Sequence, residues 1–396
     1  HETLPSTAAM VSGGGRLFYI IDEGSRVNIE HPAEWNLIAR DAFNGLILWK
    51  RPLASWVHAE RGLWGGPIQM PRRLVVHGER LYAPLELGGP VHEIDAVTGE
   101  TKQVFQESAG AGEILRTEDG LFVTIQSFEE EGLPNKPATP DAKAVCRIDP
   151  VTGRQGWRKD EPCSPMTLTV ANGFVAYHSE KSLVCRDAAT GDEIWRITVT
   201  EKHWDRNETP SLVIYKDTLL YSGGTKSIQG YALADGRELW RDAVMEGCRY
   251  VGRNLFVIDD TVWTAEVNGG RFKDVLIKGR HHRTGATVSE FKSDEKPYIF
   301  PHHRCYPDKA TCNYLLTGRT GIEFVDLKSK HVINHHWVRG ECVSGIVPAN
   351  GLVYSAPIPC ACYTEAKMTG YTAVSAVSAE SRRPAKPRPR LEKGRA

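Results

Sequence analysis

Short apolar runs alternate along the chain with compact polar turns, and the stretch Leu183–Arg196 (LVCRDAATGDEIWR) shows this pattern most clearly. Its apolar ends predict two strands joined by a tight turn. The glycine supplies the positive φ that such a hairpin turn needs, and the Asp and Thr side chains can bond the turn's own backbone. Trp195 then lies on an outer strand, where we expect its ring to pack against a neighbouring copy of the unit.

The same turn recurs along the chain at intervals of 38 to 54 residues. Its glycine position is taken by Gly45, Gly99, Gly153, Gly191, Gly236, Gly285 and, in the last copy, Lys330. A tryptophan follows four of the copies, and we expect these four rings to occupy equivalent buried sites between units. They are Trp49, Trp157, Trp195 and Trp240. The aromatic residues assigned to the other copies are Phe105, Phe291 and Trp337. The interval is the length of a four-stranded propeller blade, not of a helical repeat.

A second recurring piece, a short turn followed by an apolar strand, precedes each of these turns, as in Gly78–Tyr82 and Asn172–Val175. The two pieces together form an inner and an outer hairpin, which make one blade. The chain contains eight inner hairpins and seven turn motifs. These counts predict an all-β fold over residues 1–378, a β-propeller of about eight (seven to eight) four-stranded blades. The last copy, Asn350–Ala376, has no following Trp strand. Because a propeller must protect its edges, we expect the N-terminal segment Ser6–Val11 to close that blade.

The repeated turn resembles the A-x-D-x-x-T-G-x-x-x-W stretch of the pyrroloquinoline-quinone-like (PQQ-like) propeller repeat family, over roughly Leu4 to Ala376. That family includes quinone-dependent dehydrogenases, outer-membrane assembly lipoproteins that only bind partners, and many secreted proteins, so the resemblance implies a fold and no single activity. The late stretches His303–Tyr306, Arg339–Cys342 and Pro348–Cys362 are similar to a subgroup of planctomycete-type secreted propellers.

The net charge of the chain is zero, because 49 Lys and Arg balance 49 Asp and Glu. It therefore gives no bias toward nucleic acid or an anionic membrane as a partner. No apolar run reaches the roughly 18 residues of a membrane helix, so we expect no membrane span. Nine cysteines favour an oxidising compartment, and we expect an extracytoplasmic protein, periplasmic or secreted, whose signal sequence is absent from a chain beginning at His1. Residues 379–396 are basic and contain prolines, which predicts a disordered tail.

Five of the nine cysteines crowd into the last two predicted blades, beside His302 and His303. They are Cys305, Cys312, Cys342, Cys360 and Cys362. Thiolate and imidazole ligands suit zinc, and a Cys-x-Cys pair can supply two of four ligands. The candidates for a structural metal are therefore Cys305, Cys342, Cys360 and Cys362. Structural disulfides and free buried thiols are the alternatives for the same residues. Cys146 and Cys185 lie in strands just before their turns, where we expect small buried hydrophobes.

Polar residues ahead of the inner hairpins converge on the axial channel of a propeller, where a ligand site would form. The candidates for binding a carboxylate or sulfate there are Arg72, Arg73, Arg304 and Arg339. His303 and Tyr306 are the candidates for proton transfer, since a lyase acting on an acidic polysaccharide needs a base and an acid. The alternative is that these side chains satisfy one another and buried backbone groups.

His203 and Trp204 lie in a loop between two predicted blades. Surface loops on a rigid scaffold commonly carry binding residues, and an exposed indole can stack on a sugar or a peptide. The alternative is a Trp packed between blades like its counterparts in the repeats.

Three functions of different classes fit these observations. The first is a secreted or periplasmic binding scaffold for a protein or an anionic glycan. The second is a glycan-active enzyme, a lyase or hydrolase on acidic polysaccharide, which uses the late His, Arg and Tyr residues. A quinoprotein dehydrogenase ranks last, because the resemblance implies an adjacent Cys-Cys pair and a calcium ion in such members, and this chain has no Cys-Cys pair. We therefore do not expect PQQ as a cofactor, and a structural metal remains open.

Overall fold

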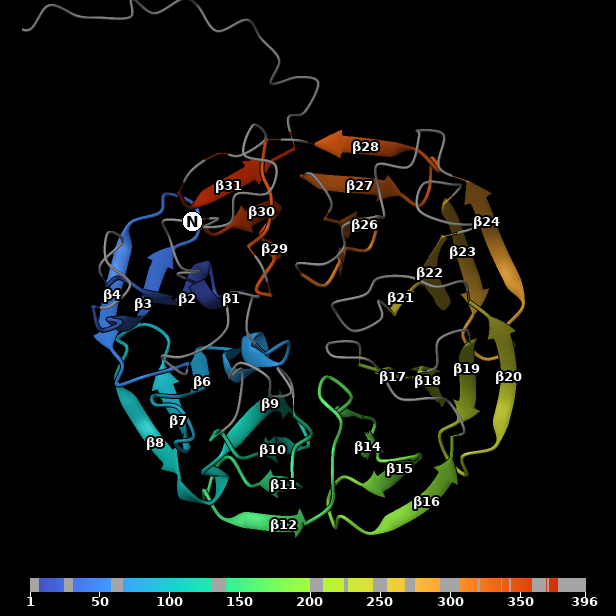
Figure 1. The fold of residues 1–396 in the computed structure, drawn as a ribbon, viewed down its shortest axis with the longest axis horizontal. Coiled ribbons are helices and arrows are strands. Elements are labelled where there is room, and N and C mark those ends of the chain that lie inside the picture. Colours follow the sequence, from blue (N-terminus) through green and yellow to red (C-terminus); the bar gives the residue numbers. More distant parts are fainter. Residues whose placement is uncertain are drawn as a thin grey trace, which may run out of the picture.

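Each predicted pair of hairpins folds into one small antiparallel sheet, and eight such sheets form a ring around a central axis (Figure 1). The structure is a computed structural model that describes residues 7–24, 31–57, 67–129, 140–199, 209–223, 227–244, 255–267, 275–292, 306–318, 321–335, 337–341, 343–357, 368 and 370–376. Within these residues, helix is confined to two short 3-10 segments, η1 (Met70–Arg73) and η2 (Gln106–Ser108). The prediction of an all-β propeller of eight blades is confirmed.

The first half of the ring contains four blades of four strands. Blade 1 consists of β1 (Thr7–Gly13), β2 (Arg16–Asp22), β3 (Trp35–Asp41) and β4 (Ile47–Pro52). Blade 2 consists of β5 (Val75–His77), β6 (Arg80–Pro84), β7 (Val91–Asp95) and β8 (Thr101–Phe105). Blade 3 consists of β9 (Ala111–Thr117), β10 (Gly120–Ile125), β11 (Ala144–Ile148) and β12 (Gln155–Lys159). Blade 4 consists of β13 (Thr169–Ala171), β14 (Phe174–Ser179), β15 (Ser182–Asp187) and β16 (Glu193–Thr198).

The second half contains three further four-stranded blades and one blade with three described strands. Blade 5 consists of β17 (Ser211–Tyr215), β18 (Thr218–Ser222), β19 (Ser227–Ala232) and β20 (Glu238–Ala243). Blade 6 consists of β21 (Phe256–Ile258), β22 (Thr261–Val267), β23 (Val275–His281) and β24 (Thr287–Lys292). Blade 7 consists of β25 (Lys309–Ala310), β26 (Tyr314–Thr317), β27 (Ile322–Asp326) and β28 (Val332–His335). Blade 8 consists of β29 (Ile346–Ala349), β30 (Leu352–Ser355) and β31 (Thr372–Ser375).

The strands of a blade follow one another from the axis to the rim, so that β1, β9, β17 and β29 lie near the centre of Figure 1 and β4, β12, β16 and β20 lie at its edge. The second strand is the most buried, because neighbouring blades cover both of its faces. Every residue of β10 is buried, whereas β4 has none that is fully buried. This gradient explains why the sequence shows apolar inner hairpins and polar outer strands.

The turn between the third and fourth strands of a blade is held by its aspartate. In blade 4 the Asp187 carboxylate accepts hydrogen bonds from the N–H groups of Ala189 and Thr190, at 2.9 and 2.8 Å. Gly191 then adopts a φ of +74° and donates its N–H to the Asp187 carbonyl. The backbone hydrogen bonds hold the pKa of Asp187 below its usual value, as they do at the equivalent aspartates. Those are Asp41, Asp95, Asp149 and Asp326.

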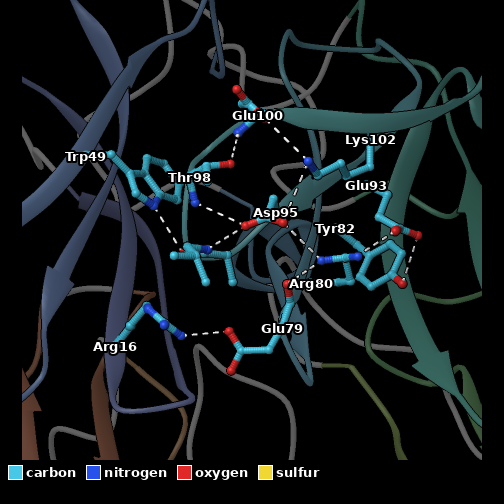
Figure 2. Close-up of polar contacts among 12 residues, drawn as sticks. Arg16, Trp49, Glu79, Arg80, Tyr82, Glu93, Asp95, Thr98, Glu100 and Lys102 are labelled. Atoms are coloured by element: carbon cyan, nitrogen blue, oxygen red, sulfur yellow. Dashed lines mark hydrogen bonds and ion pairs between the residues drawn. The ribbon is translucent and has the colours of Figure 1, made fainter.

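Four indoles join consecutive blades in the same way, and we call this arrangement a tryptophan junction. The indole N–H of Trp195 donates to the Leu233 carbonyl of the next blade at 2.8 Å. Its ring covers the next turn glycine, since a Cβ atom added to Gly236 would lie 2.7 Å from the ring. Trp49, Trp157 and Trp240 repeat this contact on Ala96, Ala188 and His282, at 3.1, 3.0 and 2.7 Å. Figure 2 shows the first of these junctions, with Trp49 beside the Asp95 turn. The expected equivalence of the four tryptophans is confirmed in their contacts, although Trp49 is only partly buried whereas the other three are buried.

Blade 2 forms the same junction without a tryptophan. Four residues after its turn glycine stands Gln103, not Phe105, and its side-chain amide donates to the Pro150 carbonyl at 3.3 Å and accepts the Gly153 N–H at 3.0 Å. The residues at this position in blades 6 and 7 are Ser289 and Asn334, so the assignment of Phe291 and Trp337 to it was wrong. Trp337 follows the last strand of blade 7 and is 71% exposed.

The ring does not close through the N-terminal strand in the way the sequence suggested. Thr7–Gly13 forms β1, the innermost strand of blade 1, and it pairs with β2 in its own sheet. The sheet of blade 8 has the order β29-β30-β31, and no described strand pairs with the outer edge of β31. The expectation that Ser6–Val11 supplies the missing outer strand was therefore wrong. The continuous apolar run of this segment, AAMV, suits an innermost strand equally well, so the sequence pattern alone does not distinguish the two positions.

Two expectations concern parts of the chain beyond the blades. None of the described helical segments is long and apolar enough to cross a membrane. The basic tail, residues 379–396, lies outside the described residues, so its disorder stays a prediction.

Candidate functional site

The junction between blade 8 and blade 1, called here the ring-closing junction, differs from the tryptophan junctions although its turn is the same. The Asp41 carboxylate accepts the N–H groups of Phe43 and Asn44 at 2.9 Å, and Gly45 has a φ of +76°. A Cβ atom added to Gly45 would meet no atom of a described residue within 4 Å. At the four tryptophan junctions the same atom would meet an indole at 2.7 or 2.8 Å. Blade 1 thus presents a complete turn that no described side chain covers.

Apolar side chains surround this uncovered turn. Phe43 and Leu46 are each 67% exposed, and Ile47 and Leu48 are about half exposed. Isolated apolar residues on a surface are ordinary, but four of them within six positions form a contiguous apolar segment at the rim of blade 1. In Figure 1 this rim adjoins β31 of blade 8, whose outer edge pairs with no described strand. An apolar turn and an unpaired strand edge therefore lie at the same junction.

The blades that meet here are held together by polar side chains closer to the axis. The N–H of Thr7 donates to the buried Glu341 carboxylate at 3.2 Å. The side-chain amide of Asn350 donates to the Ser12 hydroxyl at 2.9 Å. These contacts join the segment before blade 8, and the blade itself, to β1. They occur once in the ring and belong to no repeat.

Aromatic stacking completes the ring-closing junction. The rings of Tyr19 and Tyr371 lie 4.4 Å apart between centroids, and the Arg40 guanidinium lies 5.3 Å from the Tyr371 ring centre. Arg40 also donates to the Tyr19 hydroxyl at 2.6 Å and to the Gly45 carbonyl at 2.7 Å. Burial raises the pKa of both phenols above the usual value for tyrosine, so both remain neutral. The inner part of the junction is thus closed by packing, while no residue that the structure describes covers its outer part.

The second candidate region is the central channel, where the structure brings together some of the expected residues. Arg72 on η1 donates to the Glu113 carboxylate of β9 at 2.8 Å, and Glu113 also accepts the Met166 N–H at 2.7 Å. Glu113 is only 2% exposed, so this ion pair bridges blades 2, 3 and 4 beside the axis. Arg72 retains part of its exposure, and its part in binding an anion stays a prediction.

Arg73 has a different role from its neighbour. Its side chain is buried, its Nε donates to the Gly112 carbonyl at 3.3 Å, and its guanidinium lies 4.7 Å from the centre of the Phe128 ring. These contacts belong to the packing between blades 2 and 3. Its proposed part in anion binding stays a prediction without support from this geometry.

Tyr306 and Arg339, expected in the ligand site, are both 1% exposed. The Tyr306 hydroxyl donates to the Gly321 carbonyl at 3.2 Å and accepts the Gly340 N–H at 3.4 Å. Burial raises its pKa far above the usual range, and its ring fills the space that the hydrogen side chains of Gly318 and Gly340 leave open. This environment suits a packing residue between blades 7 and 8, and the alternative in which these residues satisfy buried groups fits it best.

Eight of the candidate residues lie outside the described residues, and their roles stay predictions. They are His203, Trp204, His303, Arg304, Cys305, Cys342, Cys360 and Cys362. Cys146 and Cys185 are fully buried free thiols, as expected, and burial raises the pKa of each to about 12. Cys312 is free and exposed.

The geometry defines an eight-bladed β-propeller, and comparisons with known proteins agree with that class. The family model described as outer membrane protein assembly factor BamB matches residues 138–275, which include Trp157, Trp195 and Trp240. This match supports the resemblance to the PQQ-like repeat family over that part of the chain. No curated protein sequence gave a significant match.

Solved structures show the same architecture at low identity. The computationally designed Ika8 protein is 11% identical with a TM-score of 0.56, over 90% of this chain and 93% of that one. Quinohemoprotein alcohol dehydrogenase from Comamonas testosteroni is 10% identical with a TM-score of 0.56, over 94% of this chain and 75% of that one. BamB from Moraxella catarrhalis is 15% identical with a TM-score of 0.48, over 78% and 81% of the two chains. Identities in this range show the fold alone.

A quinone cofactor does not fit the described channel residues. The cavity between the innermost strands of blades 1, 2, 7 and 8 is walled mainly by aliphatic side chains such as Leu74, Val76 and Val347. Its charged side chain is Lys309, a cation, whereas calcium requires oxygen ligands. Across the described ranges, no three His, Cys, Asp or Glu side chains are grouped so as to hold a metal. We therefore derive no chemistry through a quinone.

Proposed function

We propose that this protein is a binding scaffold that takes up an extended segment of a partner protein at the ring-closing junction. One observation carries the proposal: blade 1 offers the same turn that a tryptophan covers at four other junctions. Within the described residues no atom lies over Gly45, and no strand pairs with the outer edge of β31. An extended segment that pairs with β31 would occupy the position of a fourth strand. Its main chain would give affinity, and its side chains would give specificity.

The tryptophan junctions indicate which side chain such a segment carries. At each of them a strand at the rim places an indole on the turn of the next blade and donates its N–H to a turn carbonyl. The equivalent carbonyl at the ring-closing junction belongs to Ala42. A partner strand with a tryptophan as its third residue, as in β4, β12, β16 and β20, would repeat this geometry on Phe43, Ala42 and Gly45.

A role in binding also agrees with the matched family model, whose description is that of an assembly factor. We place the protein outside the cytoplasm, periplasmic or secreted, on the basis of that resemblance and the cysteine content. A glycan-active enzyme stays an alternative prediction, since His303 and Arg304 lie outside the described residues.

The chain itself provides a probe for this site. A synthetic peptide with the sequence of residues 190–199 (TGDEIWRITV) carries the tryptophan in its natural strand, and the same peptide with Ala for Trp is its control. We expect the first peptide to bind the full chain and the second to bind at least about tenfold more weakly, measured by fluorescence anisotropy of a labelled peptide.

A matched pair of variants places the binding site. Phe43 and Val151 hold the same turn position in blades 1 and 3, and both are largely exposed. Phe43→Glu introduces a charge at the ring-closing junction and should weaken peptide binding at least about tenfold, whereas Val151→Glu should leave it unchanged. Equal effects of the two variants, or equal binding of the two peptides, would contradict the proposed site.

A further inference from the structure

The central channel contains a cavity of about 380 Å³ that the proposed strand-binding site does not use. Its walls come from the innermost strands of blades 1, 2 and 8 and from the first residue of β25 in blade 7. Most wall residues are aliphatic, and one carries a charge. The residues that matter here are Met10, Leu74, Val76, Ile346, Val347 and Lys309. This volume is in the range of small-molecule sites, which are mostly apolar with a few polar groups that fix orientation.

Lys309 is the polar group that distinguishes this cavity. Its ammonium makes no hydrogen bond or ion pair with any described residue, although salt bridges and side-chain hydrogen bonds are common elsewhere in the ring. Burial lowers the pKa of Lys309, the positive charge of Arg72 lowers it further, and Asp308 opposes both effects. Lys309 is half-buried, and within the described residues no carboxylate pairs with its ammonium, so this side chain can accept an anion from a ligand.

Arg72 contributes to the electrostatics without being the anchor. Its guanidinium already pairs with the buried Glu113 carboxylate at 2.8 Å. Arg72 does not line the cavity, and Lys309 is the one charged residue among the described lining residues, which favours a ligand with a single negative charge. The aliphatic wall next to Lys309 calls for an apolar body on the same ligand.

We infer that the channel binds an amphipathic monoanion, with its anionic group on the Lys309 ammonium and its alkyl chain against Met10, Leu74, Val76, Ile346 and Val347. Neither part suffices alone. A small hydrophilic anion gains little from the aliphatic wall, and a neutral alkane derivative leaves the ammonium without a partner. The carboxylate of a short fatty acid satisfies both requirements, and an alkyl sulfate would do so as well.

Isothermal titration calorimetry with the full chain tests this inference with three probes that differ in one feature at a time. Octanoate has both the charge and the chain, 1-octanol has the chain without the charge, and acetate has the charge without the chain. We expect octanoate to bind at least about tenfold more tightly than either of the others. Octyl sulfate should bind as well, which would show that the anion and not the carboxylate is recognised.

Two lysine variants locate the anionic group. Lys309→Met keeps the length of the side chain and removes its charge, and it should reduce octanoate affinity at least about tenfold while leaving 1-octanol binding unchanged. Lys328→Met removes an exposed lysine of the same blade and should change neither. Should Lys309→Met unfold the chain, titration of the native protein at rising pH gives the same information, because octanoate binding should be lost at a lower pH than the pKa of an exposed lysine allows. Equal affinities for octanoate and 1-octanol, or equal effects of both variants, would overturn the inference and leave the strand-binding proposal untouched.

Discussion

The tryptophan junctions and the ring-closing junction solve the same packing problem with different residues. At the first kind, one indole on a rim strand covers the turn of the next blade and bonds its carbonyl, as Trp195 does on Gly236 and Leu233. At the second, Glu341, Asn350 and Tyr371 join the blades near the axis, and no described side chain covers the turn at the rim. The difference shows that the repeat motif includes the residue that joins one blade to the next. Where the motif is interrupted, apolar side chains at the rim of blade 1 stay exposed.

The largest predicted difference is in the free energy of unfolding when an indole is removed. Trp195→Ala should lower the free energy of unfolding by about 3 to 5 kcal/mol, because a buried ring and its hydrogen bond are both lost. Trp337→Ala should change it by less than about 0.5 kcal/mol, because that ring is exposed and lies outside the repeat. Denaturant unfolding of both variants measures the contrast. A similar cost for both would mean that the tryptophan junctions do not stabilise the ring.

The turn glycines compare the two regions directly. Gly191→Asn and Gly45→Asn place the same side chain in the same left-handed conformation, which Asn tolerates better than other residues. The added Cβ meets the Trp157 ring at 2.7 Å in the first case and no described atom in the second. We expect Gly191→Asn to cost about 1 to 3 kcal/mol more than Gly45→Asn in denaturant unfolding. Equal costs would mean that the turn of blade 1 is covered after all.

The polar contacts of the ring-closing junction can be tested at Glu341, which accepts the Thr7 N–H. Glu341→Ala removes the acceptor for the Thr7 N–H and leaves buried donors at the ring-closing junction without it, which should cost about 1 to 3 kcal/mol. Hydrogen exchange should accelerate in β1 and β29. It should stay unchanged in β14 and β18 of blades 4 and 5, which are joined by a tryptophan junction. Loss of protection spread evenly over all eight blades would show that the junction is not a separate local unit.

The smallest predicted effect concerns the pKa of the turn aspartates, which should be lowered in both regions. Backbone hydrogen bonds lower the pKa of Asp41 and of Asp187 in the folded chain. A carboxyl with a lowered pKa contributes stability that is present above its unfolded pKa of about 3.9 and is lost as the pH falls through the folded pKa. Carboxyl titration by NMR should therefore give both residues values below about 3.9. An ordinary value for Asp41 alone would mean that the blade 1 turn is not formed.

The sequence predicted the repeated part of this fold well, because each blade carries the same local signals. Asp187, Gly191 and Trp195 have fixed spacing, and the turn bonds and the junction follow from it. Gln103 was not identified from the sequence, because its polar side chain does not resemble an indole although it makes two hydrogen bonds across the junction. The closure of the ring was misassigned because one apolar strand at the N-terminus suits either an inner or an outer position.

The candidate site was predicted less well, and for a different reason. Arg72 is partly exposed and pairs with Glu113, whereas its neighbour Arg73 and the late Tyr306 are buried between blades. A side chain that precedes an inner strand points either to the axis or into the gap between blades, and composition does not distinguish the two. Lys309 was missed because it is a single lysine at the first position of a two-residue strand, with no motif around it.

Hydrogen exchange at β31 tests the central claim most directly, since it reports on the edge where the partner segment is proposed to pair. Without a ligand, amides of Thr372–Ser375 that point away from β30 should exchange rapidly, while the equivalent third strands β11, β15 and β19, which pair with β12, β16 and β20, should exchange more slowly. Adding the tryptophan peptide TGDEIWRITV should slow exchange in β31, and the alanine control peptide should not. Slow exchange throughout β31 in the free protein, or equal protection by the two peptides, would contradict an open, tryptophan-selective edge at the ring-closing junction.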